Sequence, residues 1–528
     1  MSGTLAERLA QWLSAQGVRH AFGMPGGVLL GLVDAFRRFG IDFVLVRHEG
    51  SAGFMADACA QLTGSPGVCV GTLGPGVTNL VSPVAGAHLE RSPVVAITGQ
   101  IQTDLLGTYT HQILDHVALF EPITRAATLL TRDGAREQIS EALGALRRDV
   151  PGPVLIDVPA ELWSMPLEPL DVDTPAPAER VDATAAVARL QDAHRPVLVV
   201  GHLQLTDAVA QAVTTLAERL QAPVVTTYRA KGAISDAHPL CAGAFGLSPV
   251  VDHHQQALIG RADVLVAIGL DPVELRPQWL PGWSPDLPMV RVGSSRDIPH
   301  PCTHDLGDHV LSGLDAINSS LGAVSSQWRE TEVEAHNEAW SAPFDDGPDG
   351  PATTIRAVQE AMGPDALCSM DVGAHRITAS HVWRCTKPWA QLQSNGFSSM
   401  GTGLPGAIAA RLVHPDRPVV ALTGDMGLWM TLGELGIVQE RGLDLVVVYL
   451  ADQSLSLIEL KQERIPLPNH GVRFDNPSVG ALAAAFGGVG HEVRGAEPVA
   501  RAVRAAVESG GLHLIEASIN AERYREQM

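Results

Sequence analysis

The stretch PVVALTGDMG at residues 418–427 joins an apolar run to an acidic, glycine-rich turn, and this junction decides the fold class. The apolar part predicts a buried strand, and the turn is typical of the point where a helix begins. A second apolar run at 443–450 ends at Asp452-Gln453-Ser454. Because neighbouring parallel strands end at the same edge of a sheet, we expect Asp425 and Asp452 to lie close together beside a helix N-terminus.

Two carboxylates at such an edge indicate a site for a hard divalent cation. Carboxylate oxygens suit Mg²⁺, which keeps open positions for phosphate oxygens. The unpaired N–H groups of the helix N-terminus favour the same anion. A βαβ unit with two turn aspartates and no ligand explains the spacing equally well, and the feature that decides between them lies upstream.

That feature is Glu49. Arg47-His48-Glu49 follows a predicted strand at 43–46 and precedes a helix of small residues at 50–61. A carboxylate just beyond a parallel strand lies where α/β sheets bind ligands, although Glu49 alone is also typical of a helix start favoured by the dipole. The turns FGMPGG (22–27) and TLGPGVTN (72–79) would bring backbone N–H groups close to a ligand, and the second lacks the GxGxxG order of a dinucleotide site.

Length, charge and cysteine content restrict the kind of protein. A chain of 528 residues, 45% hydrophobic and 18% charged, is long enough for three domains of roughly 150–200 residues. The net charge of −21 argues against nucleic acid or an anionic membrane as a partner. No apolar run reaches the roughly 18–20 residues that span a bilayer, and the N-terminus lacks the apolar region of a signal peptide. The six cysteines form no CxxC pair or zinc spacing, so we expect mostly buried thiols in a cytoplasmic protein.

Short apolar runs alternate with helical stretches, which predicts an α/β fold with mostly parallel, helix-covered sheets. Proline-rich acidic sequence at 166–179 and polar, poorly periodic sequence at 325–352 predict two linkers, so the chain divides into three consecutive domains. The predicted strands are 18–22, 43–46, 67–72, 94–98 and 154–158 in the first domain; 196–200, 223–227, 264–269 and 288–292 in the second; and 366–371, 418–423, 443–450 and 512–517 in the third.

Motifs in a fixed order carry a resemblance to a known family. They are FGMPGG, RHE, TLGPGVTNL, ITGQ, GPVLIDVP, KGAISDAHPL, DVGAH, GLPGAIAA and GDMG…ADQ, spread over nearly the whole chain. The chain resembles the thiamine-diphosphate-dependent enzymes of the acetolactate synthase group. The resemblance implies a pyrimidine-binding domain at 1–165 and a diphosphate-binding domain at 350–528, both with the thiamine-diphosphate-binding fold, and a Rossmann-like central domain at 185–325.

In that family thiamine diphosphate and Mg²⁺ lie between the first domain of one subunit and the third of another, which implies a homodimer at least and a homotetramer as the usual assembly. Glu49 matches the carboxylate that hydrogen-bonds the aminopyrimidine. Met400 matches the bulky residue that keeps the cofactor bent, although core packing is the commoner role of a methionine. Asp425, Asp452 and the carbonyl of Ser454 match the Mg²⁺ ligands, with Asp452 where relatives carry asparagine. The other positions matched to cofactor binding are Thr72, Asn79, Gly373, His375, Gly424 and Met426, of which His375 alone would more often be structural.

The resemblance also implies decarboxylation of a 2-oxo acid, pyruvate first among the candidates, before the resulting enamine meets a second reactant. Gln112 matches the glutamine of the carboligating synthases, since an amide can hold an acceptor carbonyl without protonating the enamine. His111 stands where those synthases carry an aromatic residue and could restore some protonation, while Gly27 leaves room near the reacting carbon. We therefore expect an acetolactate synthase-like carboligase. The alternatives are a non-oxidative decarboxylase or carbon–carbon lyase of the same family, a thiamine-diphosphate oxidase, which the lack of a flavin pattern disfavours, and a non-catalytic paralogue, which is less favoured because Glu49 and Asp425 are intact.

The helix after the second aspartate lines the substrate pocket in relatives, so Leu457, Ile458 and Lys461 are candidate pocket residues together with Val28. Lys461 could bind the carboxylate of a second 2-oxo acid, and a solvated helix lysine beside acidic neighbours explains it equally well. Several relatives bind FAD in the central domain. Here the last predicted central strand runs into GSSRD (293–297) without the acidic pair expected near an adenosine, so FAD is not expected.

Overall fold

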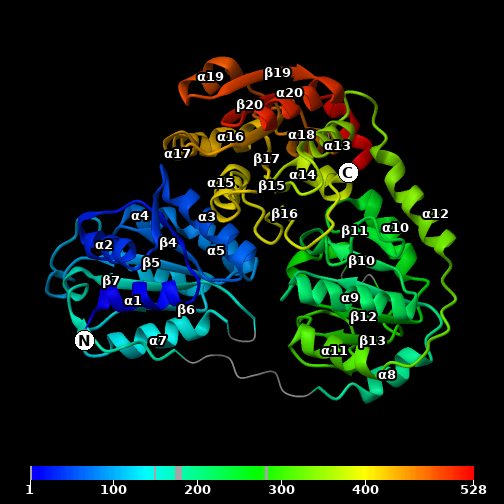
Figure 1. The fold of residues 1–528 in the computed structure, drawn as a ribbon, viewed down its shortest axis with the longest axis horizontal. Coiled ribbons are helices and arrows are strands. Elements are labelled where there is room, and N and C mark those ends of the chain that lie inside the picture. Colours follow the sequence, from blue (N-terminus) through cyan, green and yellow to red (C-terminus); the bar gives the residue numbers. More distant parts are fainter. Residues whose placement is uncertain (1–2, 148–149, 173–180, 280–282, 466) are drawn as a thin grey trace.

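Three parallel six-stranded sheets, each flanked by helices, form three lobes of the molecule (Figure 1). The computed structural model describes residues 3–147, 150–172, 181–279, 283–465 and 467–528. The predicted α/β class with three consecutive domains is confirmed. Within those ranges, no helix has the length and apolar character needed to cross a membrane.

The first sheet has the strand order β3-β2-β4-β5-β7-β6. Strands β4 (Gly67–Gly71) and β5 (Val94–Gln100) are buried throughout, as expected of central strands in a sheet covered on both faces. The other strands are β2 (His20–Gly23), β3 (Asp42–Leu45), β6 (Ala126–Leu129) and β7 (Val154–Pro159), and the helices are α1 (Leu5–Ala15), α2 (Leu30–Arg38), α3 (Glu49–Thr63), α4 (Pro75–Asn79), α5 (Val81–Leu89), α6 (His116–Phe120) and α7 (Ala135–Ala145).

The central sheet has the order β11-β10-β9-β12-β13-β14. All its strands are parallel, and the chain builds the sheet outward from β9 to one edge and then from β12 to the other edge. This is the doubly wound arrangement of a Rossmann-like domain, as predicted. Its strands are β9 (Pro196–Val200), β10 (Val224–Thr227), β11 (Cys241–Phe245), β12 (Val264–Ile268), β13 (Met289–Val292) and β14 (His304–Asp305), with helices α8 (Thr184–Gln191), α9 (Asp207–Leu220), α10 (Pro249–Ile259) and α11 (Val310–Ser320).

The third sheet has the order β16-β15-β17-β18-β20-β19. Strands β17 (Val419–Gly424) and β18 (Leu445–Ala451) are paired in parallel, with Gly424 opposite Leu450. The strand ends that carry Asp425 and Asp452 are therefore neighbours. The other strands are β15 (Leu367–Met370), β16 (Gln391–Leu392), β19 (Val489–Arg494) and β20 (Leu512–Ser518), and the helices are α13 (Pro351–Met362), α14 (Ala374–Val382), α15 (Gly403–Val413), α16 (Asp425–Thr431), α17 (Leu435–Arg441), α18 (Ser456–Arg464), α19 (Val479–Ala485), α20 (Ala496–Ser509) and α21 (Tyr524–Gln527).

The five strands of these sheets that the sequence pattern did not predict all lie at sheet edges. They are β6, β11, β14, β16 and β19. Strands β14 and β16 have only two residues each, and β19 has no buried residue. An edge strand pairs on one side only and need not bury both faces, so it leaves little apolar pattern to detect.

The second predicted linker, 325–352, is wrong, because α12 (Glu330–Ser341) and the 3₁₀ helix η8 (Ala342–Phe344) fill most of it. Val333 is the one buried residue of α12, so the helix has almost no apolar period. An ion pair of 3.1 Å between Arg195 and Glu332 holds α12 to the central domain. The first predicted linker, 166–179, contains strand β8 (Pro166–Leu167), which pairs antiparallel with β1 (Gly3–Thr4); residues 173–179 lie outside the described part of the chain.

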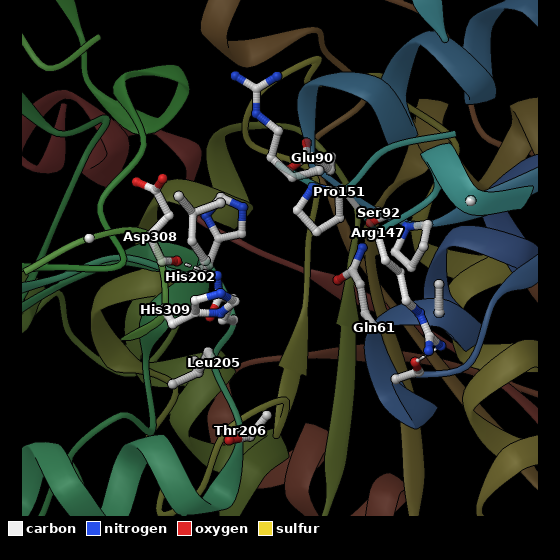
Figure 2. Close-up of a pocket in the computed structure, with 18 of the residues that line it drawn as sticks. Gln61, Glu90, Ser92, Arg147, Pro151, His202, Leu205, Thr206, Asp308 and His309 are labelled. Atoms are coloured by element: carbon white, nitrogen blue, oxygen red, sulfur yellow. Dashed lines mark hydrogen bonds between the residues drawn. The ribbon is translucent and has the colours of Figure 1, made fainter. Parts of the chain in front are cut away.

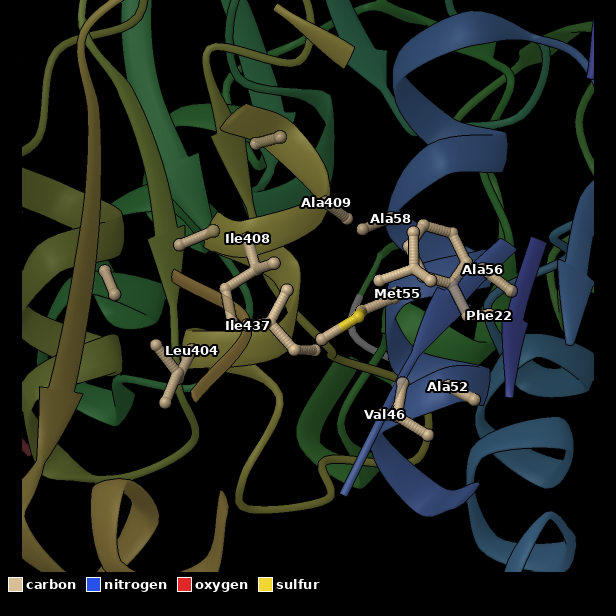
Figure 3. Close-up of a cluster of buried hydrophobic side chains, with 14 of the residues drawn as sticks. Phe22, Val46, Ala52, Met55, Ala56, Ala58, Leu404, Ile408, Ala409 and Ile437 are labelled. Atoms are coloured by element: carbon tan, nitrogen blue, oxygen red, sulfur yellow. The ribbon is translucent and has the colours of Figure 1, made fainter. Parts of the chain in front are cut away.

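The first and third domains pack together through α3 and α15, and one cluster of buried hydrophobic residues extends across both. Figure 3 shows Met55 of α3 reaching toward Ile408 of α15 and Ile437. All three side chains are buried. Alanine residues along both helices, including Ala56 and Ala409, let the two backbones approach closely.

A buried ion pair joins all three domains. Glu90, which follows α5, lies 2.8 Å from Arg229 of the central domain, and the side chains are 1% and 2% exposed. The second carboxylate oxygen of Glu90 accepts hydrogen bonds of 2.8 Å from Ser394 Oγ and Gly396 N in the third domain. A buried charge is tolerated only when it is paired and hydrogen-bonded, so each of these groups depends on the others.

We expect Glu90→Gln to destabilise the protein by about 3–5 kcal/mol, because the amide removes the negative charge that lies 2.8 Å from the buried guanidinium of Arg229. Urea unfolding measures the loss. The control is Glu497→Gln, which removes an exposed carboxylate paired with Arg501 and should change the free energy of unfolding little. Equal stability of the two variants would contradict the dependence of the domain junction on Glu90.

Candidate active site

Glu49 begins α3, and its carboxylate faces the glycine turn at the start of α4. The residue is buried, with 6% of its surface exposed. Asn79 Nδ2 donates a hydrogen bond of 2.9 Å to Glu49 Oε2. A Cβ atom on Gly76 would lie 3.1 Å from Glu49 Oε1, so a side chain there would crowd the carboxylate. Glu49, Gly76 and Asn79 thus form one unit at the carboxyl edge of the first sheet.

The turn after β2 lies at the same edge. A Cβ atom on Gly26 would lie 2.1 Å from Thr72 Oγ1, which shows how closely this turn approaches the end of β4. Gly27 and Val28 belong to the short helix η1 (Gly27–Leu29), where Val28 packs against Gly99. A Cβ atom on Gly27 would meet nothing within 4 Å among the described residues, so there is open space beside this position.

The loop between η2 (Thr103–Leu105) and α6 carries His111 and Gln112, and both residues are exposed. Gln112 has a left-handed φ of +60°. Its Cβ lies 2.9 Å from the position that a Cβ on Gly74 would occupy, so the loop rests on the glycine turn. His111 stacks edge-on against Tyr109, with ring centroids 6.2 Å apart. The loop therefore brings Gln112 to the turn that also faces Glu49.

Asp425 begins α16, and the loop after β18 binds its carboxylate. Gln453 N donates a 2.9 Å hydrogen bond to Asp425 Oδ2, and Asn476 Nδ2 donates one of 3.2 Å to the same oxygen. Met426 N donates to Asp425 Oδ1 at 3.3 Å. Asn476 also accepts a 3.2 Å hydrogen bond from Trp429 Nε1, so it bridges Asp425 and Trp429, which both lie on α16. The sequence did not single out Asn476, because nothing in its local pattern marks a partner that comes from a distant loop.

Asp452 lies in the same loop, directly after β18. Ser454 N donates a 3.2 Å hydrogen bond to Asp452 Oδ1, and Ser456 Oγ donates to Oδ2. Burial, together with the negative charges of Asp425 and Glu459, raises the pKa of Asp452 to about 7. Burial also raises the pKa of Asp425. A buried and a half-buried carboxylate that repel each other form an environment that a divalent cation stabilises.

His375, in the first turn of α14, lies over two glycines of this edge. A Cβ atom on Gly373 would lie 2.6 Å from its ring, and one on Gly424 would lie 3.2 Å from it. Burial and the nearby charge of Arg376 lower the pKa of His375 to about 3, so the ring is neutral at neutral pH. Its Nε2 is buried without a hydrogen-bond partner in the part of the chain that the structure describes. A buried, unpartnered nitrogen of this kind indicates a place for a polar ligand atom.

Asp371, at the end of β15, is a residue of the site that the sequence reasoning missed. Its buried carboxylate accepts hydrogen bonds from Gly401 N at 2.8 Å and from Thr423 Oγ1 at 3.2 Å. These bonds fix the turn of Met400 against the end of β17. Met400 itself is half-buried and so does not lie in the centre of the core. The sequence did contain a pattern that marks Asp371. It follows a buried strand and comes two residues before a glycine in DVGAH, as Asp425 does in GDMG.

A second missed residue is Glu434, in η9 (Leu432–Glu434) of the third domain. Its buried carboxylate accepts hydrogen bonds of 3.1 Å from Arg47 N and His48 N, directly before Glu49. Burial raises the pKa of Glu434. The third domain of the same chain thus fixes the backbone that leads into Glu49, which no local sequence pattern could reveal.

The three candidate pocket residues of α18 differ in their exposure to solvent. Leu457 packs against the core of the third domain. Ile458 is 43% exposed, and Lys461 is exposed. The structure therefore leaves Ile458 and Lys461 available to a ligand and assigns Leu457 to packing as well.

Comparison with known proteins accounts for this arrangement. Models of the thiamine pyrophosphate enzyme N-terminal TPP binding domain, central domain and C-terminal TPP binding domain match residues 3–119, 183–296 and 371–517. The chain belongs to the thiamine pyrophosphate enzyme family. It is 31% identical to the acetolactate synthase isozyme 1 large subunit of Escherichia coli (strain K12), over 87% of this chain and 83% of that protein. It is 30% identical to the acetolactate synthase of Bacillus subtilis (strain 168), over 98% and 93%, and 30% identical to the isozyme 2 large subunit of Escherichia coli (strain K12), over 97% and 95%.

The residues of this thiamine pyrophosphate enzyme fit the cofactor of the family. The group around Glu49 lies in the N-terminal TPP binding domain, and the group around Asp425 lies in the C-terminal one. The buried Nε2 of His375, which has no partner among the described residues, leaves a place for a polar atom of the bound cofactor. The mutual repulsion of Asp425 and Asp452 suits a divalent cation that accompanies the diphosphate. The amide of Asn79 that hydrogen-bonds Glu49 is neutral and so does not pair with the carboxylate as a counter-charge.

A cavity of about 1520 Å³ lies away from these residues, between the first and central domains (Figure 2). His202, Leu205 and Asp308 line it on one side, and Gln61 and Arg147 on the other. None of the site residues predicted from the sequence is among its lining residues. In this thiamine pyrophosphate enzyme the large cavity therefore belongs to a domain junction and not to the candidate active site.

We expect Asp452→Asn to raise the thermal midpoint of the metal-free protein, and by more at about pH 8 than at about pH 5. The folded-state pKa of Asp452, about 7, is raised, so below it the carboxyl is neutral like the amide. Above it the carboxylate is penalised by the loss of solvent and is repelled by Asp425 and Glu459. Calorimetry with a chelator present measures the difference. The exposed Asp416→Asn is the control. A pH-independent effect of Asp452→Asn would show that charge repulsion is not the cause.

Proposed function

We propose that this enzyme catalyses the Mg²⁺-dependent decarboxylation of a 2-oxo acid, pyruvate first among the candidates, and ligates the remaining carbon unit to a second carbonyl compound. The observation that carries the proposal is the packing of Gln112 on Gly74, in the turn whose next glycine faces Glu49. The residue that would supply a neutral amide is thereby anchored on the turn that faces the Glu49 carboxylate. The relatives named acetolactate synthases, at about 30% identity over most of the chain, support the same reaction.

Bound thiamine diphosphate supplies the electron sink that lets a 2-oxo acid lose CO₂. Glu49 would hold and share a proton with the aminopyrimidine end, because Asn79 orients its carboxylate without neutralising it. Gln112 would donate its amide N–H to the acceptor carbonyl, and an amide has no proton to give up at neutral pH. Gly27 leaves space for the substrate beside η1.

The diphosphate end would be held by the third domain. Asp425, Asp452 and the carbonyl of Ser454 would bind Mg²⁺, which would relieve the repulsion between the two carboxylates. The residues that would surround the diphosphate and the bent cofactor are Gly373, His375, Met400, Gly424 and Met426, with Thr72 and Asn79 at the pyrimidine end. FAD has no part in this proposal.

A second copy of the chain would complete the site. Apolar side chains are exposed around the Gln112 loop, where Tyr109 and Leu114 are each 47% exposed. Others are exposed near the third-domain site, where Met430 is 57% and Leu467 is 56% exposed. Apolar patches at both half-sites are typical of surfaces that a partner covers, which favours a homodimer as the minimum and a homotetramer as the assembly.

One observation favours a second candidate function, a simple decarboxylase. His111 is exposed next to Gln112 in the same loop, where an imidazole can deliver a proton that an amide cannot. Protonation would release an aldehyde and end the reaction before carbon–carbon bond formation.

The decisive experiment incubates the purified protein with thiamine diphosphate, Mg²⁺ and pyruvate and separates acetolactate from acetaldehyde. We expect acetolactate as the main product, and we expect Glu49→Gln to lower kcat by about 10²-fold or more because proton sharing is lost. Thr78→Val, at an exposed position of the same turn, is the control. Acetaldehyde as the main product would favour the decarboxylase. If neither acetolactate nor acetaldehyde forms, pyruvate is excluded as the donor.

The role of Lys461 is tested separately. If its ammonium binds the carboxylate of a second 2-oxo acid, Lys461→Ala raises KM for the acceptor by about tenfold with little change in kcat, since a charged hydrogen bond contributes about 1.5–3 kcal/mol. Lys387→Ala, at another exposed lysine, should leave both constants unchanged. An unchanged KM in Lys461→Ala would make Lys461 a solvated surface residue.

A further inference from the structure

A buried histidine–aspartate pair lies behind the glycine turn, and the proposed function does not use it. His116 begins α6, and Asp157 lies on β7; their side chains are 0% and 2% exposed. His116 Nδ1 is 3.0 Å from Asp157 Oδ2, and Thr98 Oγ1 donates a 2.7 Å hydrogen bond to Asp157 Oδ1. The far side of the imidazole reaches the turn, where Gly74 N lies 3.4 Å from His116 Nε2 and donates to it.

These contacts select one form of the ring. A backbone N–H can be accepted only by an unprotonated Nε2, so the proton of the neutral imidazole must lie on Nδ1. Asp157, an acceptor, holds that proton, and its other oxygen is fixed by Thr98. Gln100 Nε2 lies 3.3 Å from Nδ1 but donates no hydrogen bond to it in this form of the ring, since an N–H group cannot donate to a protonated nitrogen. The carboxylate therefore turns the acceptor nitrogen of His116 toward Gly74.

The bond has a geometric consequence for Gln112. Gly74 has φ +70° and ψ −110°, a conformation that favours glycine, and the backbone and Cβ of Gln112 pack directly on it. His116 also follows Gln112 by four residues and ends the loop that carries it. One imidazole thus holds the turn beneath Gln112 and the chain that leaves it.

We propose that His116, oriented by Asp157, is a positioning residue that fixes the Gly74 turn and through it the amide of Gln112. The inference rests on the proposed function, in which Gln112 holds the acceptor carbonyl. Loss of the imidazole acceptor would leave the hydrogen bond between Asn79 and Glu49 in place and would loosen the Gly74 turn on which Gln112 rests, the residue that would decide between ligation and release. We therefore expect a change in the ratio of the ligated product to the released aldehyde.

The test compares His116→Phe, which fills the space without an acceptor, with His116→Gln, whose side-chain oxygen can accept from Gly74 N. We expect the ratio of acetolactate to acetaldehyde from pyruvate to fall about tenfold in His116→Phe and to recover in part in His116→Gln. The affinity for thiamine diphosphate, measured by calorimetric titration, should stay within about twofold of the wild type in both. Hydrogen exchange of peptides covering residues 72–76 should accelerate in His116→Phe only.

The chain offers a matched control in the central domain. His202 Nδ1 lies 2.8 Å from Glu274 Oε2, which also accepts from Thr227 Oγ1 at 2.8 Å, so a second buried histidine has the same kind of partners far from the turn. His202→Phe should lower stability without changing the product ratio. An unchanged ratio and unchanged exchange at 72–76 in His116→Phe would overturn the inference. If the wild type forms neither product, the proposed function fails, and the exchange at 72–76 still decides whether His116 holds the turn.

Discussion

The contact between Glu90 and Arg229 is the interaction on which the arrangement of the three domains depends. It is almost fully buried, and the carboxylate also binds the backbone and side chain of the turn that begins at Ser394. Neither charge can be left alone in such surroundings, because the cost of desolvation is recovered only through the partner. The end of α5, the central domain and the segment that leads to Met400 are therefore held in one geometry.

The same principle recurs at both halves of the site. In the first domain, Asp157 orients His116 toward Gly74, and Asn79 orients Glu49. In the third domain, Asp371 accepts a hydrogen bond from Gly401 N and so fixes the turn that contains Met400. Asp371 lies directly after β15, Glu49 begins the helix that follows β3, and Asp157 lies within β7, two residues before its carboxyl end. The polar groups of the proposed cofactor site are thus held by hydrogen bonds from other polar groups of the chain.

The pattern of strands and strand-end carboxylates was predictable, because it depends on residues close together in the chain. Apolar runs that end in Gly-Asp or Arg-His-Glu located Glu49 and Asp425, and the same rule applied to DVGAH would have found Asp371. Glu434, Asn476 and His116 could not be found in this way, since each acts on a partner that comes near only when domains or loops pack. Strands β6, β14 and β19 and helix α12 were missed because they bury too little apolar surface to leave a period in the sequence.

The sequence by itself determined the fold class, the order of the three domains and the carboxylates that stand at strand ends, because periodicity and turn chemistry are local properties of the chain. Only the tertiary structure decided which of those groups are buried, what they pair with and how they ionise. Asp452 titrates near 7 because packing removes water and brings two other carboxylates near it. His116 faces Gly74 with its unprotonated Nε2 because its Nδ1–H donates to Asp157. Desolvation and long-range pairing are properties of the packed molecule, and no spacing of residues along the chain encodes them in a readable form.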